Sequence, residues 1–375
     1  WFFLVIAPRS TIIASPELVC DYKTYLASYG VLFMMAVWFV QAAHYVSGKL
    51  KDRAVWLVSS EAQMAFLSLA LLAIGVSTYE RNKVWATAVG FWEDNARKAP
   101  GKARVHNNLG VALSEVGRYD ESVPCYYKAI SLDGYYADPY SNLAVAYSMQ
   151  NKVDDAIQAL RSAIHIFPEY PEAYNNLGTL LMQKGNKEEA EISLHQAIKL
   201  RHYYGKAYYN LARLYEERGD LEKSWESLKG AVEGDLDIAE VYFKYGQMSL
   251  KLKKYDYAAN AFQWILDKGE GSEQVWFNLA NSYYMLGKQD EARGIYERLA
   301  KNNPLDARYT YNLAEAHFAR NEFEIAHDLF KKVTSLPQPI PQSFFRAAIC
   351  LERMKKPDEA IKWLASLEAL NADQE

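Results

Sequence analysis

The 34 residues PEAYNNLGTLLMQKGNKEEAEISLHQAIKLRHYY, numbered 171–204, decide the fold of this chain. A step of 34 residues in either direction finds the same pattern from Ala103 to near the end, without an insertion. A small residue recurs at the eighth position, as Gly178 here, and another at the twentieth, as Ala190 here. Because a fixed period held over eight repeats is typical of stacked helical hairpins, the sequence predicts an all-α repeat array.

Each part of the pattern has a physical reason. The eighth and twentieth positions must be small because the two helices of a hairpin, A and B, approach closely there. The seventh and twenty-fourth positions, Leu177 and Leu194 here, fill the space between hairpins. Prolines at position 32, Pro168 and Pro304, are expected to end helix B. Position 15, where a helix end needs a positive φ, is glycine in four repeats: Gly117, Gly185, Gly219 and Gly287.

These positions resemble the tetratricopeptide repeat family, and the resemblance covers Ala103 to about Gln374. It implies a right-handed superhelix of eight helix-turn-helix repeats in which the A helices line a concave groove. We therefore expect residues 103–375 to be one domain that binds a protein or peptide partner in this groove.

Asparagine dominates the sixth position of helix A, which faces the groove in that family. An amide both donates and accepts hydrogen bonds, so a column of asparagines can pair with the backbone of an extended peptide. The column resembles the asparagine ladder of the O-GlcNAc transferase repeats. Hydrogen bonding within the helix layer is the alternative, and the sequence leaves it open. The column is Asn108, Asn142, Asn176, Asn210, Asn278 and Asn312, with Lys244 and Arg346 in the remaining repeats.

The fifth position of helix A changes character along the array. It is polar in the first three repeats and aromatic in the last five. Aromatic rings are the usual anchors of interfaces, but rings here could equally pack between successive A helices, and both interpretations remain open. The five aromatic residues are Tyr209, Phe243, Phe277, Tyr311 and Phe345.

Two apolar stretches precede the array. Residues 29–46 contain no formally charged residue and would reach roughly 27 Å as a helix, close to the thickness of a hydrocarbon core. Residues 54–79 form the second stretch, in which Glu61 is expected at an interface or facing another helix rather than in a proton relay. We expect a two-helix transmembrane hairpin over residues 29–80, after an extracytoplasmic loop at 1–28 whose apolar start looks truncated.

Lys49, Lys51 and Arg53 lie between the two stretches and favour the cytoplasmic side for that loop. The repeats would then lie on the other side of the bilayer. We therefore expect an integral membrane protein, of a bacterial inner membrane with a periplasmic array, or with a luminal array in a eukaryote.

Composition argues against several function classes. A net charge of −4 gives no electrostatic reason to expect nucleic acid as a partner. Cys20, Cys125 and Cys350 are widely spaced and odd in number, and no CxxC or Cys/His cluster occurs, so the sequence supports neither a disulfide framework nor a structural zinc site. No P-loop, GxSxG or HExxH motif occurs. We expect no catalytic residue, metal or cofactor within these 375 residues.

The junction at residues 78–110, TYERNKVWATAVGFWEDNARKAPGKARVHNNLG, carries a second resemblance. It is similar to the corresponding segment of the transmembrane-and-tetratricopeptide-repeat proteins. That family implies a glycosyltransferase-C-type, O-mannosyltransferase-like enzyme whose catalytic acidic residues would lie upstream of this chain. The matching residues are Thr78, Tyr79, Arg81, Asn82, Trp85, Phe91, Trp92, Pro100, Ala103, Arg104, Asn108, Leu109 and Gly110.

In the 34-residue frame, Ala88, Trp92 and Pro100 fall at positions 20, 24 and 32. Residues 81–102 are therefore expected to form half a repeat, a B helix that packs on the first complete repeat. Two functions follow from the sequence. The first is a membrane-anchored scaffold that binds a protein or peptide outside the cytoplasm. The alternative is the acceptor-recruiting part of a protein glycosyltransferase. Membership of a larger membrane complex stays open.

Overall fold

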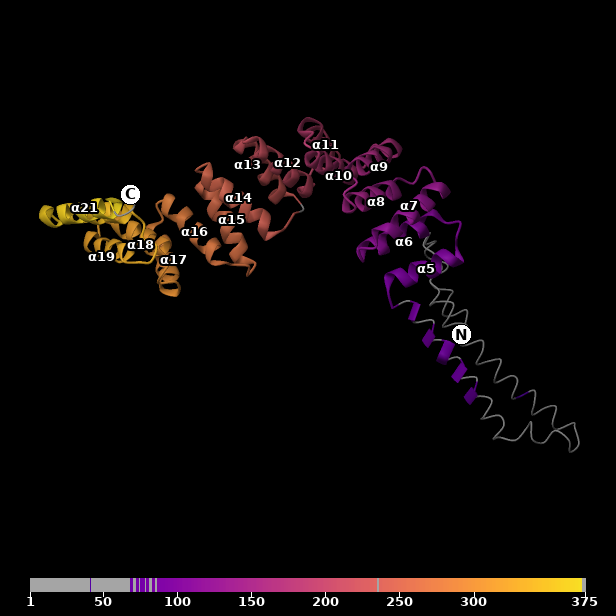
Figure 1. Cartoon of the computed structure of the whole chain (residues 1–375), viewed down its shortest axis with the longest axis horizontal. Coiled ribbons are helices and arrows are strands. Elements are labelled where there is room, and N and C mark those ends of the chain that lie inside the picture. Colours follow the sequence, from indigo (N-terminus) through magenta and orange to yellow (C-terminus); the bar gives the residue numbers. More distant parts are fainter. Residues whose placement is uncertain are drawn as a thin grey trace, which may run out of the picture. The chain divides into compact units, whose positions relative to one another are not determined.

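The computed structural model describes residues 86–234 and 236–372, and isolated positions between 41 and 84; side chains are described as far as residue 365. The chain divides into two compact units, residues 1–100 and 101–375, each of which is described by itself (Figure 1). The expected loop at 1–28 and most of the expected transmembrane hairpin lie outside the described residues. Within the described residues, no helix has the length and apolar character needed to cross a bilayer.

The first unit contributes helix α5 (Ala88–Lys98). The Thr87 hydroxyl caps its start by accepting a hydrogen bond from the Gly90 backbone N–H at 3.0 Å. In the last turn, Lys98 Nζ lies 3.0 Å from the buried carboxylate of Asp94. A helix therefore occupies the predicted half repeat. Its packing on the first complete repeat stays a prediction.

Residues 101–372 fold into eight consecutive hairpins, which follow one another in chain order (Figure 1). The A helices are α6 (Ala103–Glu115), α8 (Ala137–Met149), α10 (Pro171–Gln183), α12 (Gly205–Arg218), α14 (Ala239–Lys251), α16 (Glu273–Met285), α18 (Ala307–Ala319) and α20 (Gln342–Arg353). The B helices are α7 (Tyr119–Leu132), α9 (Val153–Ile166), α11 (Lys187–Leu200), α13 (Leu221–Glu233), α15 (Tyr255–Asp267), α17 (Gln289–Asn302), α19 (Phe323–Thr334) and α21 (Pro357–Ala372). The first seven A helices begin at position 1 of the predicted repeat, and the expected all-α hairpin array is confirmed.

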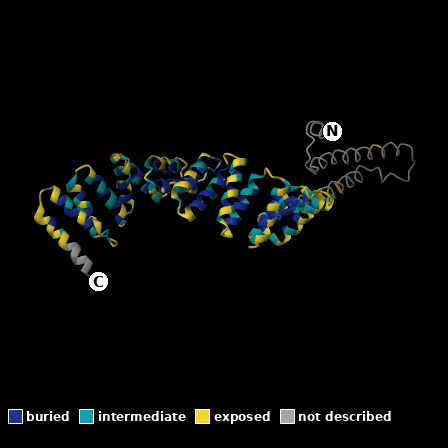
Figure 2. Ribbon diagram, turned by 90° about the horizontal axis from the view of Figure 1, so that it is seen from above, coloured by how far each residue is buried: buried dark blue, intermediate teal, exposed yellow. Residues whose placement is uncertain are grey.

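The core of this unit runs along its length between the A and B helices, as the dark blue residues in Figure 2 show. Position 24 supplies its largest side chains; Tyr126 and Phe262 are at most 1% exposed. Small residues at position 8 make room for them. A Cβ added to Gly110 would lie 2.6 Å from the Tyr126 ring, and one on Gly246 would lie 2.7 Å from Phe262. The pattern of small and large residues is therefore explained by close helix packing.

The turn between A and B uses one left-handed residue in every hairpin. The four predicted glycines have φ between 76° and 84°. The other four repeats place a non-glycine residue there at φ near 60°, at some cost in free energy. These residues are Asn151, Lys253, Asn321 and Lys355.

In the first six repeats, successive A helices approach one another at alternate interfaces. Helix α6 lies against α8, α10 against α12 and α14 against α16, while the A helices at the interfaces between these pairs contact each other less. Successive B helices also contact each other less than the paired A helices do. Because helices lie closer together on the inner side of a curved array, the A helices line the inner side of this unit.

Candidate functional site

Two adjacent pockets lie on the A side of the first three repeats. The first pocket has a volume of about 270 Å³, and the second has about 150 Å³. Val145 and Met149 of α8 belong to both pockets and form the wall that they share. The first pocket is lined by Val111, Ser114, Glu115, Tyr119, Tyr126, Asn142, Val145 and Met149. The second is lined by Ala144, Val145, Ser148, Met149, Leu160, Asn176, Thr179 and Leu180.

The second pocket is the first pocket displaced by one repeat. Each is lined by position 9 of two consecutive A helices: Val111 and Val145 in the first pocket, Val145 and Thr179 in the second. The position 24 side chain of the earlier repeat lines each pocket, and the position 6 asparagine of the later repeat does so as well. The 34-residue period therefore places two equivalent apolar recesses side by side.

Large apolar side chains are exposed at these recesses. Val145 is 45% exposed and Met149 is 60% exposed. Together with the pockets, these adjoining exposed apolar groups make this surface a candidate site for a ligand or partner. The sequence analysis missed these residues because it considered only positions 5 and 6. Positions 9 and 13 lie three and seven residues after position 6, so they share its helix face, and apolar residues there are the signal that could have identified them.

Two members of the asparagine column bond within the helix layer. The Asn142 amide donates to Asn107 Oδ1 at 2.9 Å, and the Asn210 amide donates to Asn175 Oδ1 at 2.9 Å. The two acceptors, Asn107 and Asn175, are buried at position 5 of the preceding repeat. These amides join repeat 1 to repeat 2 and repeat 3 to repeat 4.

Two other members keep an available donor. Asn108 Oδ1 accepts from Asn107 at 3.3 Å, and Asn176 Oδ1 accepts from Asn175 at 3.3 Å. The amide nitrogens of Asn108 and Asn176 donate to no group within the part of the chain that the structure describes. Of these two residues, Asn176 lines the second pocket.

The rest of the column is engaged by neighbouring groups. Asn278 is buried and accepts from Gln274 at 3.1 Å. Asn312 donates to the backbone carbonyl of Arg308 at 3.0 Å, within its own helix. Lys244 donates to the Tyr209 hydroxyl at 2.7 Å, and this hydrogen bond raises the pKa of Lys244.

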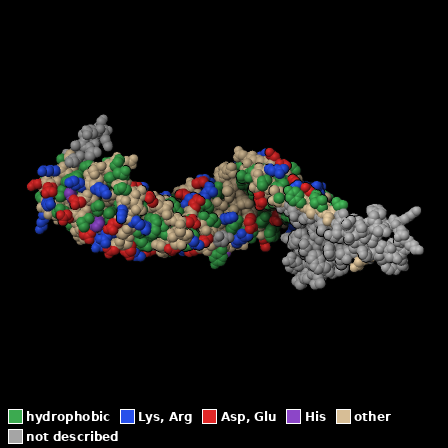
Figure 3. Space-filling model, turned by 90° about the horizontal axis from the view of Figure 1, so that it is seen from below, with side chains coloured by type: hydrophobic (Ala, Val, Ile, Leu, Met, Phe, Trp, Pro, Cys, Tyr) green, Lys and Arg blue, Asp and Glu red, His purple; other side chains and the backbone are tan. Residues whose placement is uncertain are grey.

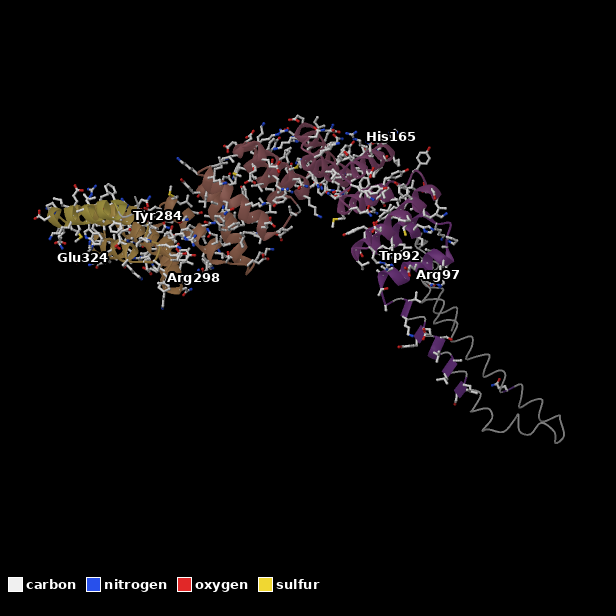
Figure 4. The ribbon with its side chains drawn as sticks, viewed as in Figure 1. Trp92, Arg97, His165, Tyr284, Arg298 and Glu324 are labelled. Carbon is white, nitrogen blue, oxygen red and sulfur yellow. The ribbon has the colours of Figure 1, made fainter. Side chains whose placement is uncertain are left out.

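At the last repeat, the column position holds a partly buried ion pair. Arg346 pairs with Glu315 and lies 4.0 Å above the Phe318 ring. Tyr284, labelled in Figure 4, belongs to the same environment, and burial raises its pKa. The A side therefore changes from apolar recesses in the first three repeats to paired charges and rings toward the last repeat.

Three of the five aromatic residues at position 5 pack edge-on against position 24 of their own hairpin. The ring pairs are Phe243 with Phe262, Phe277 with Tyr296, and Tyr311 with Phe330, with centroids 5.4–6.2 Å apart. Tyr209 donates instead to Glu240 at 3.0 Å. Phe345 is 53% exposed, the most open of the five. Packing inside the hairpin accounts for the three paired rings.

Charges of both signs are interspersed over the described surface that Figure 3 shows. Among the described residues, no group of three or more His, Cys, Asp or Glu is arranged to hold a metal ion. What distinguishes the A side is thus the pair of apolar recesses with the asparagines beside them.

Several solved structures contain similar repeats. One comes from a functional characterisation of Pseudomonas aeruginosa pilF and has 19% sequence identity to this chain and a TM-score of 0.45. The match covers 59% of this chain and 98% of that chain. A tetratricopeptide repeat protein from Parabacteroides merdae has 22% identity and a TM-score of 0.38, covering 62% of this chain and 92% of that chain. YrrB, described as a TPR protein with an unusual peptide-binding site, has 19% identity and a TM-score of 0.37, covering 47% of this chain and 91% of that chain.

No curated protein matches the chain. Sequence models described as tetratricopeptide repeat match residues 101–169 and 149–202. A further model of the same description matches 177–238, 246–307, 277–338 and 311–375, which together exceed half of the chain. The chain therefore belongs to the tetratricopeptide repeat family.

Proposed function

We propose that this protein is a scaffold that binds an extended segment of a partner protein across the A side of repeats 1–3. The observation that carries the proposal is the pair of equivalent apolar recesses on either side of Val145 and Met149. Side chains of an extended segment project at regular intervals, so two of them can fill recesses that repeat with the array. Burying Met149, which is 60% exposed, would supply apolar contact area.

The available amide donors support binding of a backbone as well as of side chains. Asn176 lines the second pocket, and its amide nitrogen is not engaged by the described residues. A peptide carbonyl above that pocket would accept from it, which orients the chain without requiring a particular sequence. Asn108 offers the same donor two repeats earlier. The other members of the asparagine column and the aromatic residues at position 5 would act mainly by shaping this surface.

The test uses random peptides displayed on phage and selected on the whole chain. Binders are then synthesised, labelled and titrated by fluorescence anisotropy. Met149→Glu should weaken binding at least about tenfold, because it places a charge in both recesses. Met285→Glu is the matched control, since Met285 holds position 13 of repeat 6 and is 51% exposed. Binders that are indifferent to Met149→Glu, or a selection that enriches no sequence, would exclude the proposal.

We further propose that residues 29–80 anchor the array in a membrane and that the repeats lie outside the cytoplasm. The uncharged stretch at 29–46 and the basic residues Lys49, Lys51 and Arg53 support this. A protein that is released from membranes by alkaline carbonate would contradict the anchor. Repeats that resist added protease in spheroplasts and are cut only after lysis would contradict the orientation.

The resemblance of residues 78–110 to the transmembrane-and-tetratricopeptide-repeat proteins favours a second candidate function. Under it, the array recruits acceptor proteins for a glycosyltransferase, and the recesses hold the acceptor. An enzyme that contains this array would then transfer sugar to peptides that the array binds. Absence of transfer to a peptide that binds tightly would remove this candidate and leave the scaffold.

A further inference from the structure

Arg213 on α12 is exposed. It makes no hydrogen bond, ion pair or ring contact with the residues that the structure describes. Several other arginines of the array are engaged: Arg161 pairs with Glu189, Arg218 with Glu191 and Arg298 with the Trp276 ring. A guanidinium has five donors, so one left unengaged on a binding face is available to an incoming acceptor.

The register places Arg213 next in line after the two pockets. It holds position 9 of repeat 4, and the same position in repeats 1–3 is Val111, Val145 and Thr179, which line the pockets. Asn210, on the same helix, donates to Thr179 Oγ1 at 3.1 Å and so ties α12 to the wall of the second pocket. A segment that continues along the array from the second pocket would therefore meet a guanidinium where it previously met apolar side chains.

The charges around Arg213 leave a local basic excess. Lys206 lies on the same helix face two turns earlier, is exposed, and also lacks a partner among the described residues. Nearby acidic groups are paired with lysines: Glu217 lies 3.3 Å from Lys187, and Glu240 lies 3.6 Å from Lys244. Glu216 is exposed on the same helix and offsets part of this positive charge.

We propose that the segment bound in the two pockets carries a carboxylate immediately beyond its apolar residues, and that Arg213 binds this carboxylate while Lys206 adds positive potential. The proposal rests on the proposed function, because it requires a segment in the pockets. The carboxylate belongs to an Asp or Glu side chain or to the C-terminus of the segment. Both would form charge-assisted hydrogen bonds with the guanidinium.

Synthetic peptides with two leucines at varied separations, followed by Asp, Asn or Lys, provide the probes. Each is made with an amidated and with a free C-terminus and is titrated against the whole chain. We expect the Asp peptides to bind roughly three- to fivefold more tightly than the Asn peptides, the range of an exposed ion pair. Raising the ionic strength should remove this difference. A preference confined to free C-termini would assign the carboxylate to the chain end.

Charge reversal at Arg213 supplies the decisive variant. Arg213→Glu should remove the preference for Asp and create one for Lys, while the affinity for Asn peptides changes little. Arg353→Glu is the matched control, because Arg353 is exposed and also lacks a partner among the described residues, but lies in repeat 8. It should change none of these preferences.

The two proposals fail in different ways. If no leucine peptide binds, or if binding ignores Met149→Glu, the proposed function fails and the carboxylate site fails with it. If the peptides bind and depend on Met149, but Asp, Asn and Lys peptides are equivalent for both wild type and Arg213→Glu, the carboxylate site alone is refuted.

Discussion

Asn175→Ala should lower the free energy of unfolding by about 1–2 kcal/mol. The side chain is buried, accepts from Asn210 at 2.9 Å and donates to Asn176 at 3.3 Å. Asn210 would keep its hydrogen bond to Thr179. The substitution therefore removes the short hydrogen bond from Asn210 and the long one to Asn176, and it leaves a small void. One net hydrogen bond contributes roughly 0.5–1.5 kcal/mol, and the void adds to that.

Urea unfolding followed by far-ultraviolet circular dichroism measures this change. Asn312→Ala is the control and should cost less than about 0.5 kcal/mol, because among the described residues Asn312 bonds only to the backbone of its own helix. The double variant with Asn210→Ala should show a coupling of roughly 0.5–1.5 kcal/mol. A loss no larger than that of Asn312→Ala, or a coupling of zero, would refute a structural role for this pair.

Three further predictions concern other parts of the array. Lys253→Gly should stabilise the protein by about 1 kcal/mol in the same urea experiment, because Lys253 has a φ of 58°. Burial raises the pKa of the Cys350 thiol to about 11, so a thiol reagent at pH 8 should label Cys125 well before Cys350. Because this thiol ionises at a lower pH in the unfolded chain than in the folded protein, the free energy of unfolding should also fall as the pH rises from about 9 toward 11. Trp225→Phe should cost about 1–2 kcal/mol of stability, because the buried indole N–H donates to Ser249 at 2.8 Å, across the interface between repeats 4 and 5.

The helices were predictable because their causes are local in the sequence. Small residues such as Gly178 and Ala190 recur with the repeat and determine where the helices of each hairpin meet, and the first seven A helices begin at the first position of the 34-residue repeat. The left-handed turn at Lys253 carried no such signal, because a lysine does not reveal a positive φ. Here the packing of the hairpin overrides the preference of the residue.

The candidate site was harder to predict because it depends on contacts between repeats. Positions 5 and 6 are neighbours on a helix, so the sequence could not decide which side chain points inward. In the structure, Phe277 turns toward the ring of Tyr296, whereas Asn142 reaches Asn107 of the preceding repeat. The recesses beside Met149 arise only when two hairpins stack.

The close approach of A helices at alternate interfaces implies that the building block of repeats 1–6 is 68 residues long rather than 34. The asparagine bonds cross the interfaces between repeats 1 and 2 and between repeats 3 and 4. Position 8 alternates between glycine and alanine in step with these interfaces through repeat 6: Gly110, Ala144, Gly178, Ala212, Gly246 and Ala280. An ancestor that grew by copying pairs of hairpins would leave this record. Inserting or deleting two repeats would preserve the alternation. Deleting a single repeat would bring unlike helix faces together, so it should destabilise the array by more than the loss of one repeat alone.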